Sequence, residues 1–111
     1  MADKPMMWRL DLSPYEFVVR VDGKAASRPY DVKGSYATVL FNPALQLTVP
    51  QAFEAKELID RISEANGSLL LDKQDYMRLQ RSVDALRAPA IEDLELLRRI
   101  RDAEKVEVEA K

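Results

Sequence analysis

Residues 34–53, GSYATVLFNPALQLTVPQAF, form a run of twenty positions without a charge, although 32% of the 111 residues of the chain are charged. Twenty residues is the length at which a membrane-spanning helix has to be considered. Pro43, Pro50 and several amide and hydroxyl side chains of this run would leave polar groups unpaired in hydrocarbon. We therefore expect the run to pass through the core of a soluble domain.

The first part of the run predicts a short helix. Asp31 can cap a helix whose apolar residues recur at the spacing of one helical face. These apolar residues are Val32, Tyr36, Val39 and Leu40. The helix should end before residues 42–43, because a residue that precedes proline is displaced from the α region. The β-branched residues within 37–41 leave a buried strand as the alternative.

The second part of the run is expected to be an apolar connector. The whole run is then expected to be the hydrophobic joint between the N-terminal sheet and the C-terminal helices. Val39 and Leu40 should pack toward the sheet. Leu45 and Leu47 should seal the connector against the helix that follows.

The N-terminal region predicts β-structure. Between residues 8 and 21 apolar and polar residues alternate with period two, which indicates two strands or one bent strand. Ser13-Pro14 is a turn signal, and Asp22-Gly23 is a dipeptide favoured in tight hairpin turns. A third strand is expected within residues 24–30. The expected core residues of this sheet are Trp8, Tyr15 and Phe17.

Three helices are expected in the second half of the chain. Residues 48–51, TVPQ, form a start signal with a capping threonine, and Asn66-Gly67 ends that helix. Asp72 is the expected cap of the next helix, which ends near Ala88-Pro89. The last helix covers residue 91 to about residue 104, with acids in its first turn and arginines toward its end. The expected buried positions are Ala52, Ala55, Ile59, Ile62 and Ala65 in the first helix and Tyr76, Leu79, Val83 and Leu86 in the second.

The sequence as a whole predicts an α+β fold with a small N-terminal antiparallel sheet followed by three or four helices. Its length is that of one domain, which we assign to residues 7–105. Residues 1–6 are expected to be a flexible N-terminus. Residues 106–111 are expected to be a frayed tail or a short edge strand.

The composition excludes much of enzyme chemistry. The chain contains no histidine and no cysteine, so the commonest general base, the commonest transition-metal ligand and the thiol nucleophile are absent. The carboxylate pairs Asp72 with Asp75 and Glu54 with Glu57 stand at helix starts, where caps and first-turn charges are ordinary. We expect a non-enzymatic protein with no catalytic residue, no cofactor and no metal.

The charge balance does not favour general binding of nucleic acid. Seventeen basic and nineteen acidic residues give a net charge of −2, whereas phosphate binding needs a concentrated basic surface. One local concentration of arginines lies on two adjacent expected helices, which invites comparison with a helix-turn-helix. The alternative function is therefore a nucleic-acid-binding regulator that uses Arg78, Arg81, Arg98, Arg99 and Arg101. Interleaved acids such as Asp84 would repel phosphates.

A protein partner, including a second copy of the chain, is the favoured hypothesis. Residues 36–53 hold more large apolar side chains than one short helix and a connector can easily bury. The candidate contact residues are Phe41, Leu45, Leu47 and Phe53. The alternative is that all four belong to the core.

The order of elements resembles that of small accessory proteins encoded by tailed bacteriophages and prophages. The resemblance covers roughly residues 30–106. After a strand-rich start it is carried by YDVKGSYATVLFNPALQL (30–47), ELIDRISEAN (57–66), LLLDKQDYMRLQRSVDAL (69–86) and LLRRIRDAEKV (96–106). It implies a non-enzymatic role in virion assembly or in binding a host protein. The absence of cysteine fits a reducing cytosol, so a cytoplasmic location is expected, which for a phage protein means the cytoplasm of the host or the virion. It transfers no functional residue, since the matching positions are core and cap positions.

Overall fold

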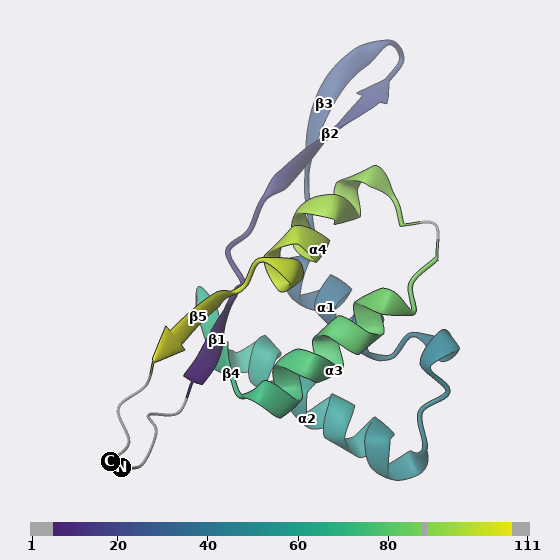
Figure 1. Cartoon of the computed structure of the whole chain (residues 1–111). Helices are drawn as coiled ribbons and strands as arrows, with labels where there is room; N and C mark the ends of the chain where they lie inside the picture. The colour runs from purple at the N-terminus through teal and green to yellow at the C-terminus, as the bar shows by residue number, and fades with distance from the viewer. Residues whose placement is uncertain (1–5, 88, 108–111) are drawn as a thin grey trace.

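The computed structural model describes residues 6–87 and 89–107 and confirms the predicted α+β fold (Figure 1). The strands of this part of the chain are β1 (Met6–Asp11), β2 (Glu16–Val21), β3 (Lys24–Pro29), β4 (Ser68–Leu71) and β5 (Glu104–Glu107). Its α-helices are α1 (Val32–Leu40), α2 (Val49–Glu64), α3 (Lys73–Asp84) and α4 (Leu94–Arg101). Two 3₁₀ turns, η1 (Pro43–Leu45) and η2 (Ile91–Asp93), precede α2 and α4.

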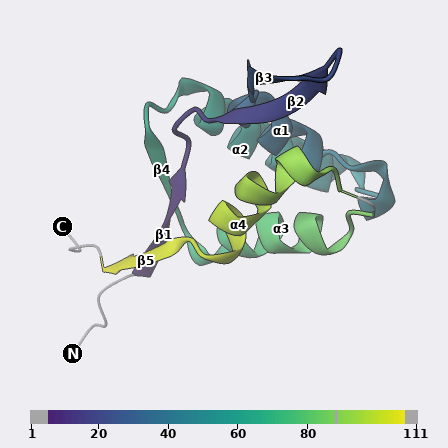
Figure 2. The same ribbon diagram turned by 90° about the horizontal axis from the view of Figure 1, so that it is seen from above.

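Strand β1 is the centre of a three-stranded antiparallel sheet at one end of the helices (Figure 2). It pairs with β4 on one side and with β5 on the other, so Trp8 lies opposite both Leu71 and Lys105. The N-terminal strand therefore binds two segments from the second half of the chain. Period two in the sequence identifies a strand, but it does not say which strand lies beside it.

Strands β2 and β3 form a separate antiparallel hairpin that projects from the rest of the molecule (Figure 1). Asp22 and Gly23 in its turn have positive φ angles of 52° and 77°, the signature of a type I′ turn. The predicted hairpin turn and the third strand are thus confirmed. Ser13-Pro14 lies between β1 and β2, as predicted, and there the chain leaves the three-stranded sheet.

The helices begin at the predicted capping residues. The Asp31 carboxylate accepts the Gly34 N–H at 3.0 Å, which confirms a helix and rejects the alternative strand for residues 32–40. Thr48 and Gln51 form a capping box at the start of α2. The Asp72 carboxylate caps α3.

The last helix is shorter than predicted. Residues 91–93 form η2, α4 ends at Arg101, and residue 104 already belongs to β5. The backbone pairing of β5 with β1 overrides the helical preference of the local sequence. Residues 106 and 107 of the predicted tail lie in β5, whereas residues 108–111 lie outside the described residues. Of the predicted flexible N-terminus, residues 1–5 also lie outside them, and Met6 begins β1.

The core lies where the four helices meet the three-stranded sheet. Its buried residues include Leu10, Leu12, Tyr36, Leu40, Leu58, Ile62, Leu71, Leu79, Leu96 and Ile100. Val39 and Leu40 are buried, but α1 packs mainly against α2 and α3 rather than toward the sheet, which it reaches through the Tyr36 hydroxyl donating to the Asp11 carbonyl at 3.0 Å. Leu45 and Leu47 are half-buried beside α3 residues in a small cavity of about 50 Å³.

Two predicted helical faces differ in detail from those observed. In α2 the buried residues are Ala55, Leu58 and Ile62, and Leu58 was not among the predicted positions. In α3 Ser82 is buried as well, and its hydroxyl donates to the carbonyl of Arg78 at 2.8 Å, which satisfies the polar group. No helix of the described ranges is long and apolar enough to cross a membrane.

Candidate functional site

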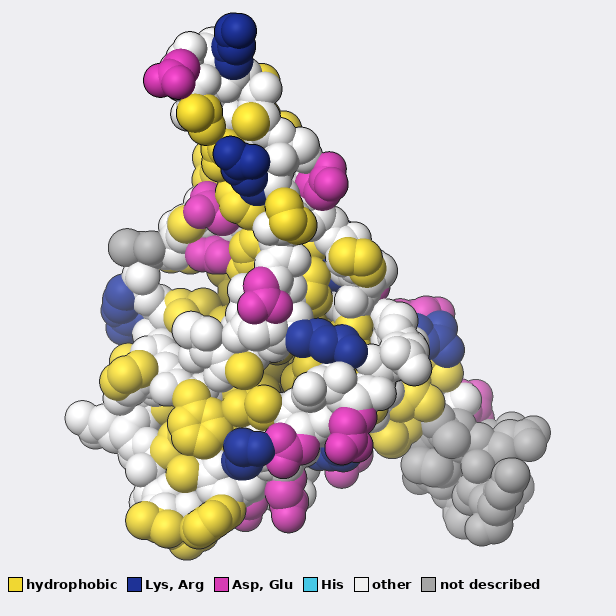
Figure 3. All heavy atoms as spheres, turned by 180° about the vertical axis from the view of Figure 1, so that it is seen from behind, with side chains coloured by type: hydrophobic (Ala, Val, Ile, Leu, Met, Phe, Trp, Pro, Cys, Tyr) yellow, Lys and Arg dark blue, Asp and Glu magenta, His cyan; other side chains and the backbone are white. Residues whose placement is uncertain are grey.

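The β2–β3 hairpin exposes side chains on both faces. Successive residues of a strand point to opposite faces, so Phe17, Val19 and Val21 share one face of β2. Glu16, Val18 and Arg20 share the other face. Val18 is 70% exposed, which is unusual for a valine in a strand, and charged and hydrophobic side chains alternate along the hairpin (Figure 3). The exposed side chains of the hairpin can therefore contact another molecule.

The base of the hairpin is attached to the body by two tyrosines. Tyr15 and Tyr30 stack with their ring centres 4.6 Å apart, and Phe17 meets Tyr30 edge-on at 6.0 Å. The Tyr15 hydroxyl donates to the carbonyl of Glu92 at 2.9 Å. The Tyr30 hydroxyl donates to the carboxylate of Asp93. Burial and this hydrogen bond raise the pKa of Tyr30 well above its usual range, so the tyrosine keeps its donated proton.

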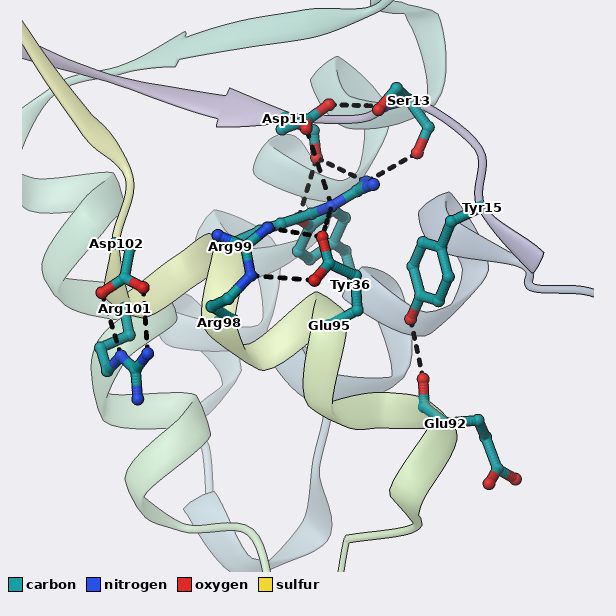
Figure 4. A network of polar contacts seen from close by, with 10 residues as sticks. All are labelled: Asp11, Ser13, Tyr15, Tyr36, Glu92, Glu95, Arg98, Arg99, Arg101 and Asp102. Carbon is teal, nitrogen blue, oxygen red and sulfur yellow. Dashed lines mark hydrogen bonds and ion pairs between the residues drawn. The ribbon is translucent and has the colours of Figure 1, made fainter. Parts of the chain in front are cut away.

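Arg99 ties α4 to the connection between β1 and β2 (Figure 4). Its side chain is buried, and its guanidinium donates to the carbonyls of Ser13 at 2.6 Å and Asp11 at 3.4 Å. It also contacts the Glu95 carboxylate at 3.2 Å and lies 4.9 Å from the ring centre of Tyr15. These contacts set the direction in which the chain leaves β1 toward the hairpin.

The carboxylates of this network are ionised at neutral pH. Hydrogen bonds from Arg98 and Arg99 lower the pKa of Glu95 to about 2. Burial alone would raise the pKa of Asp11, but hydrogen bonds from Ser13 and the charge of Arg99 outweigh it and lower the pKa. A general acid or base works best with a pKa near the operating pH. These two side chains therefore suit the attachment of elements better than proton transfer.

The two outer edges of the hairpin differ. The Tyr30 N–H donates to the Tyr15 carbonyl at 2.9 Å. In an antiparallel ladder such hydrogen-bonded pairs alternate, so Phe17 and Val19 bond to β3. The backbone N–H and C=O groups of the intervening residues point outward from the free edge of β2. These residues are Glu16, Val18 and Arg20.

The β3 edge carries features that discourage pairing with another chain. Lys24 and Arg28 place like charges on it, and Pro29 has no N–H to donate. The β2 edge has no proline, and its two charges are opposite in sign. Of the two edges, β2 is the one that can accept a further strand.

The predicted contact residues Phe41, Leu45, Leu47 and Phe53 do not form one exposed patch. Phe53 is 70% exposed on α2 and Phe41 is 43% exposed after α1, whereas both leucines are half-buried. The leucines line the small cavity beside α3. Of these four residues, only the two phenylalanines present large apolar surface to solvent.

Most arginines of the nucleic-acid alternative face carboxylates. Arg78 pairs with Glu54, Arg98 with Glu95, and Arg101 with Asp102. Arg99 is only 7% exposed and is used internally. Arg81 is exposed and has no ion pair within the part of the chain that the structure describes. The five side chains therefore offer phosphate little free positive charge.

A groove of about 700 Å³ separates α3 from α4. Its lining combines apolar residues with charged ones and includes Val83, Asp84, Leu94, Leu97, Arg98 and Arg101. Leu94 is half-exposed at this groove.

The carboxylate pair noted at the start of α3 has an ordinary structural role: Asp72 caps α3, and Asp75 pairs with Arg61. Residues 6–87 and 89–107 contain no cluster of three or more carboxylates that could hold a metal ion.

Comparison with known proteins does not assign the chain to a family. No protein-family model matches the chain, and neither the curated proteins nor the solved structures give a match.

The outer edge of β2 was not among the candidate sites predicted from the sequence. Its signal is the placement of opposite charges on either side of Val18, together with the protective residues on β3.

Proposed function

We propose that the protein is a non-catalytic protein–protein interaction module that binds through the outer edge of β2. The free edge of this strand is the observation that carries the proposal. Its outward backbone groups are a template for pairing with another chain, and exposed Val18 lies at its centre. The side chains add specificity, because residues on alternate faces contact different parts of an added strand.

The role in virion assembly or in binding a host protein belongs to this proposal as well. It is supported by the resemblance of residues 30–106 to phage accessory proteins. The absence of histidine and cysteine and the low pKa values of Glu95 and Asp11 support a binding role over a catalytic one.

Photo-crosslinking tests the proposal. A benzophenone amino acid replaces Val18 in the full chain, which is produced in cells of its natural host. The matched control carries the same group at Glu57, an exposed position on α2. We expect covalent adducts with a protein at position 18 and not at position 57. Adducts at both positions, or at neither, would contradict binding through the β2 edge.

The nucleic-acid alternative predicts a different result. A gel-shift titration with duplex DNA would show binding that weakens steeply as salt rises, because phosphate contacts release counterions. We expect no shift at moderate salt, since the arginines concerned are paired or buried. A salt-dependent shift abolished by Arg81→Ala would favour the alternative function.

A further inference from the structure

We propose that the β2 edge pairs with the β2 edge of a second copy of this chain, which joins two hairpins into one four-stranded sheet. The inference rests on the proposed function and names its partner. Pairing is antiparallel about a two-fold axis at Val18. The strand order in the sheet is then β3 and β2 of one copy, followed by β2 and β3 of the second copy. Three features of the hairpin support this arrangement.

The backbone register supports it first. Glu16, Val18 and Arg20 point their N–H and C=O groups outward from β2. With the axis at Val18, this residue lies opposite Val18 of the second copy, and Glu16 lies opposite Arg20. All outward groups of the three residues then meet complementary groups. A shift of the axis by one residue leaves one of them without a partner.

The charges support the same register. Glu16 and Arg20 lie on one face of β2, about 13 Å apart at a rise of ~3.3 Å per residue, too far apart to pair within one chain. Arg20 has no ion pair among the residues that the structure describes. The Glu16 carboxylate accepts only a hydrogen bond from Ser27, at 2.6 Å, within those residues. In the two-fold pair, each Glu16 faces an Arg20, and each carboxylate gains a cation.

The apolar side chains complete the match. Val18, 70% exposed in one copy, lies against Val18 of the other on the charged face. On the opposite face Phe17 lies across from Val19, and this contact occurs twice. An isolated two-stranded ribbon is marginal in water, and the sheet of four strands reaches the size at which an apolar face can make a sheet stable. The projection of the hairpin keeps the two bodies apart at opposite ends of the shared sheet (Figure 1).

The same operation applied to β3 lacks this match. The β3 residues whose backbone groups point outward are Ala25, Ser27 and Pro29, so the corresponding axis passes through Ser27 and places Pro29 of one copy opposite Ala25 of the other. Pro29 has no N–H to donate, and these three residues supply no charge pair. The β2 edge therefore fits itself better than the β3 edge does, which favours a closed dimer over a chain of hairpins that pair through both edges.

Charge reversal tests the register. Sedimentation analysis of the full wild-type chain should show a concentration-dependent dimer. Glu16→Arg and Arg20→Glu should each weaken dimerisation roughly tenfold or more, because like charges then meet twice across the axis. The double variant Glu16→Arg/Arg20→Glu should restore the dimer. An equal mixture of the two single variants should associate, since each supplies the charges that the other lacks.

Arg28→Glu on β3 is the matched control, because it changes the net charge as Arg20→Glu does and lies on the other edge. It should leave the dimer intact. Circular dichroism of each single variant should match the wild type, and recovery of association in the mixture shows that both variants fold. A monomeric wild type at all concentrations, a dimer unaffected by the reversals, or a mixture that stays monomeric would each overturn self-pairing.

The proposed function can fail separately. If the wild type is monomeric but position 18 still crosslinks to a different protein, the β2 edge binds another partner and only self-pairing is wrong. If the wild type is monomeric and position 18 crosslinks to nothing, both proposals are wrong.

Discussion

The guanidinium of Arg99 lies over the ring of Tyr15, 4.9 Å from its centre. Arg99 belongs to α4, and Tyr15 is the last residue before β2. The contact therefore links the C-terminal helix to the base of the projecting hairpin, and the same guanidinium donates to the carbonyl of Ser13 at 2.6 Å. Loss of Arg99 should loosen the hairpin at its point of attachment.

We expect Arg99→Ala to lower the free energy of unfolding by about 2–3 kcal/mol, because the Ser13 carbonyl loses its donor, the Asp11 carboxylate loses a cation 3.7 Å away, and Glu95 loses one of its two arginine partners. The value stays below that of a fully buried ion pair, since Asp11 and Glu95 are partly exposed. Chemical denaturation measures the loss. Arg98→Ala, on the exposed side of the same helix, should cost less than about 1 kcal/mol. Equal losses in both variants would contradict a special role of the buried arginine.

The stability of the protein should depend on the ionisation of Glu95. Its pKa is about 2 in the folded chain, below the value of 4.5 that the free side chain has. A lowered pKa means that the ionised group favours the folded state, so its contribution is complete above about pH 4.5 and is lost as the pH falls toward about 2. The wild type should exceed Glu95→Gln in stability at pH 6, and the difference should shrink toward pH 2. A difference that is constant with pH would show that ionisation is not the cause.

Leu40 should be essential to the core. It is 1% exposed, so Leu40→Ala should cost about 2–5 kcal/mol, the range for substitutions that create a cavity. Phe53→Ala is the matched control, because this side chain is larger but 70% exposed. Its cost should stay below about 1 kcal/mol. A denaturation midpoint of Leu40→Ala equal to that of the wild type would contradict the packing of α1 between α2 and α3.

The exposed phenylalanine should also be separate from self-association. Phe53→Asp places a charge on α2, which lies at the end of the molecule opposite the hairpin (Figure 1). Light scattering should give the same mass for this variant and for the wild type at equal concentrations. A loss of the dimer in Phe53→Asp alone would transfer the contact surface to the residues first suggested by the uncharged run.

Helix starts were predictable because their signals are local. Asp31, Thr48 and Asp72 each bond to a backbone group three residues away, and such a pattern can be recognised without knowledge of the fold. The Asp22-Gly23 turn was predictable for the same reason. The uncharged run divides at its prolines into α1, η1 and the start of α2, as the sequence indicated.

Contacts between distant residues were not predictable in this way. Nothing local to β1 shows that it pairs with β4 and β5, so the last helix was predicted to extend to about residue 104, although α4 ends at Arg101. Arg99 looked like one of several surface arginines, because its burial depends on carbonyls more than eighty residues away. The outer edge of β2 is free because β1 lies in the other sheet, between β4 and β5, and nothing local to β2 indicates this.

The hairpin should open independently of the body, and Gly23 provides a test. It has a φ of 77° and nothing within 4 Å of an added Cβ, so Gly23→Ala introduces backbone strain of about 1–2 kcal/mol and no clash. We expect amide exchange at Val19, which bonds to β3, to accelerate roughly fivefold to thirtyfold while exchange at Leu40 stays unchanged. Gly67→Ala is the matched control, since its φ is 76° with equal free space but it precedes β4 in the body. Acceleration at Val19 in both variants would show that hairpin and body open as one unit, and would contradict the prediction.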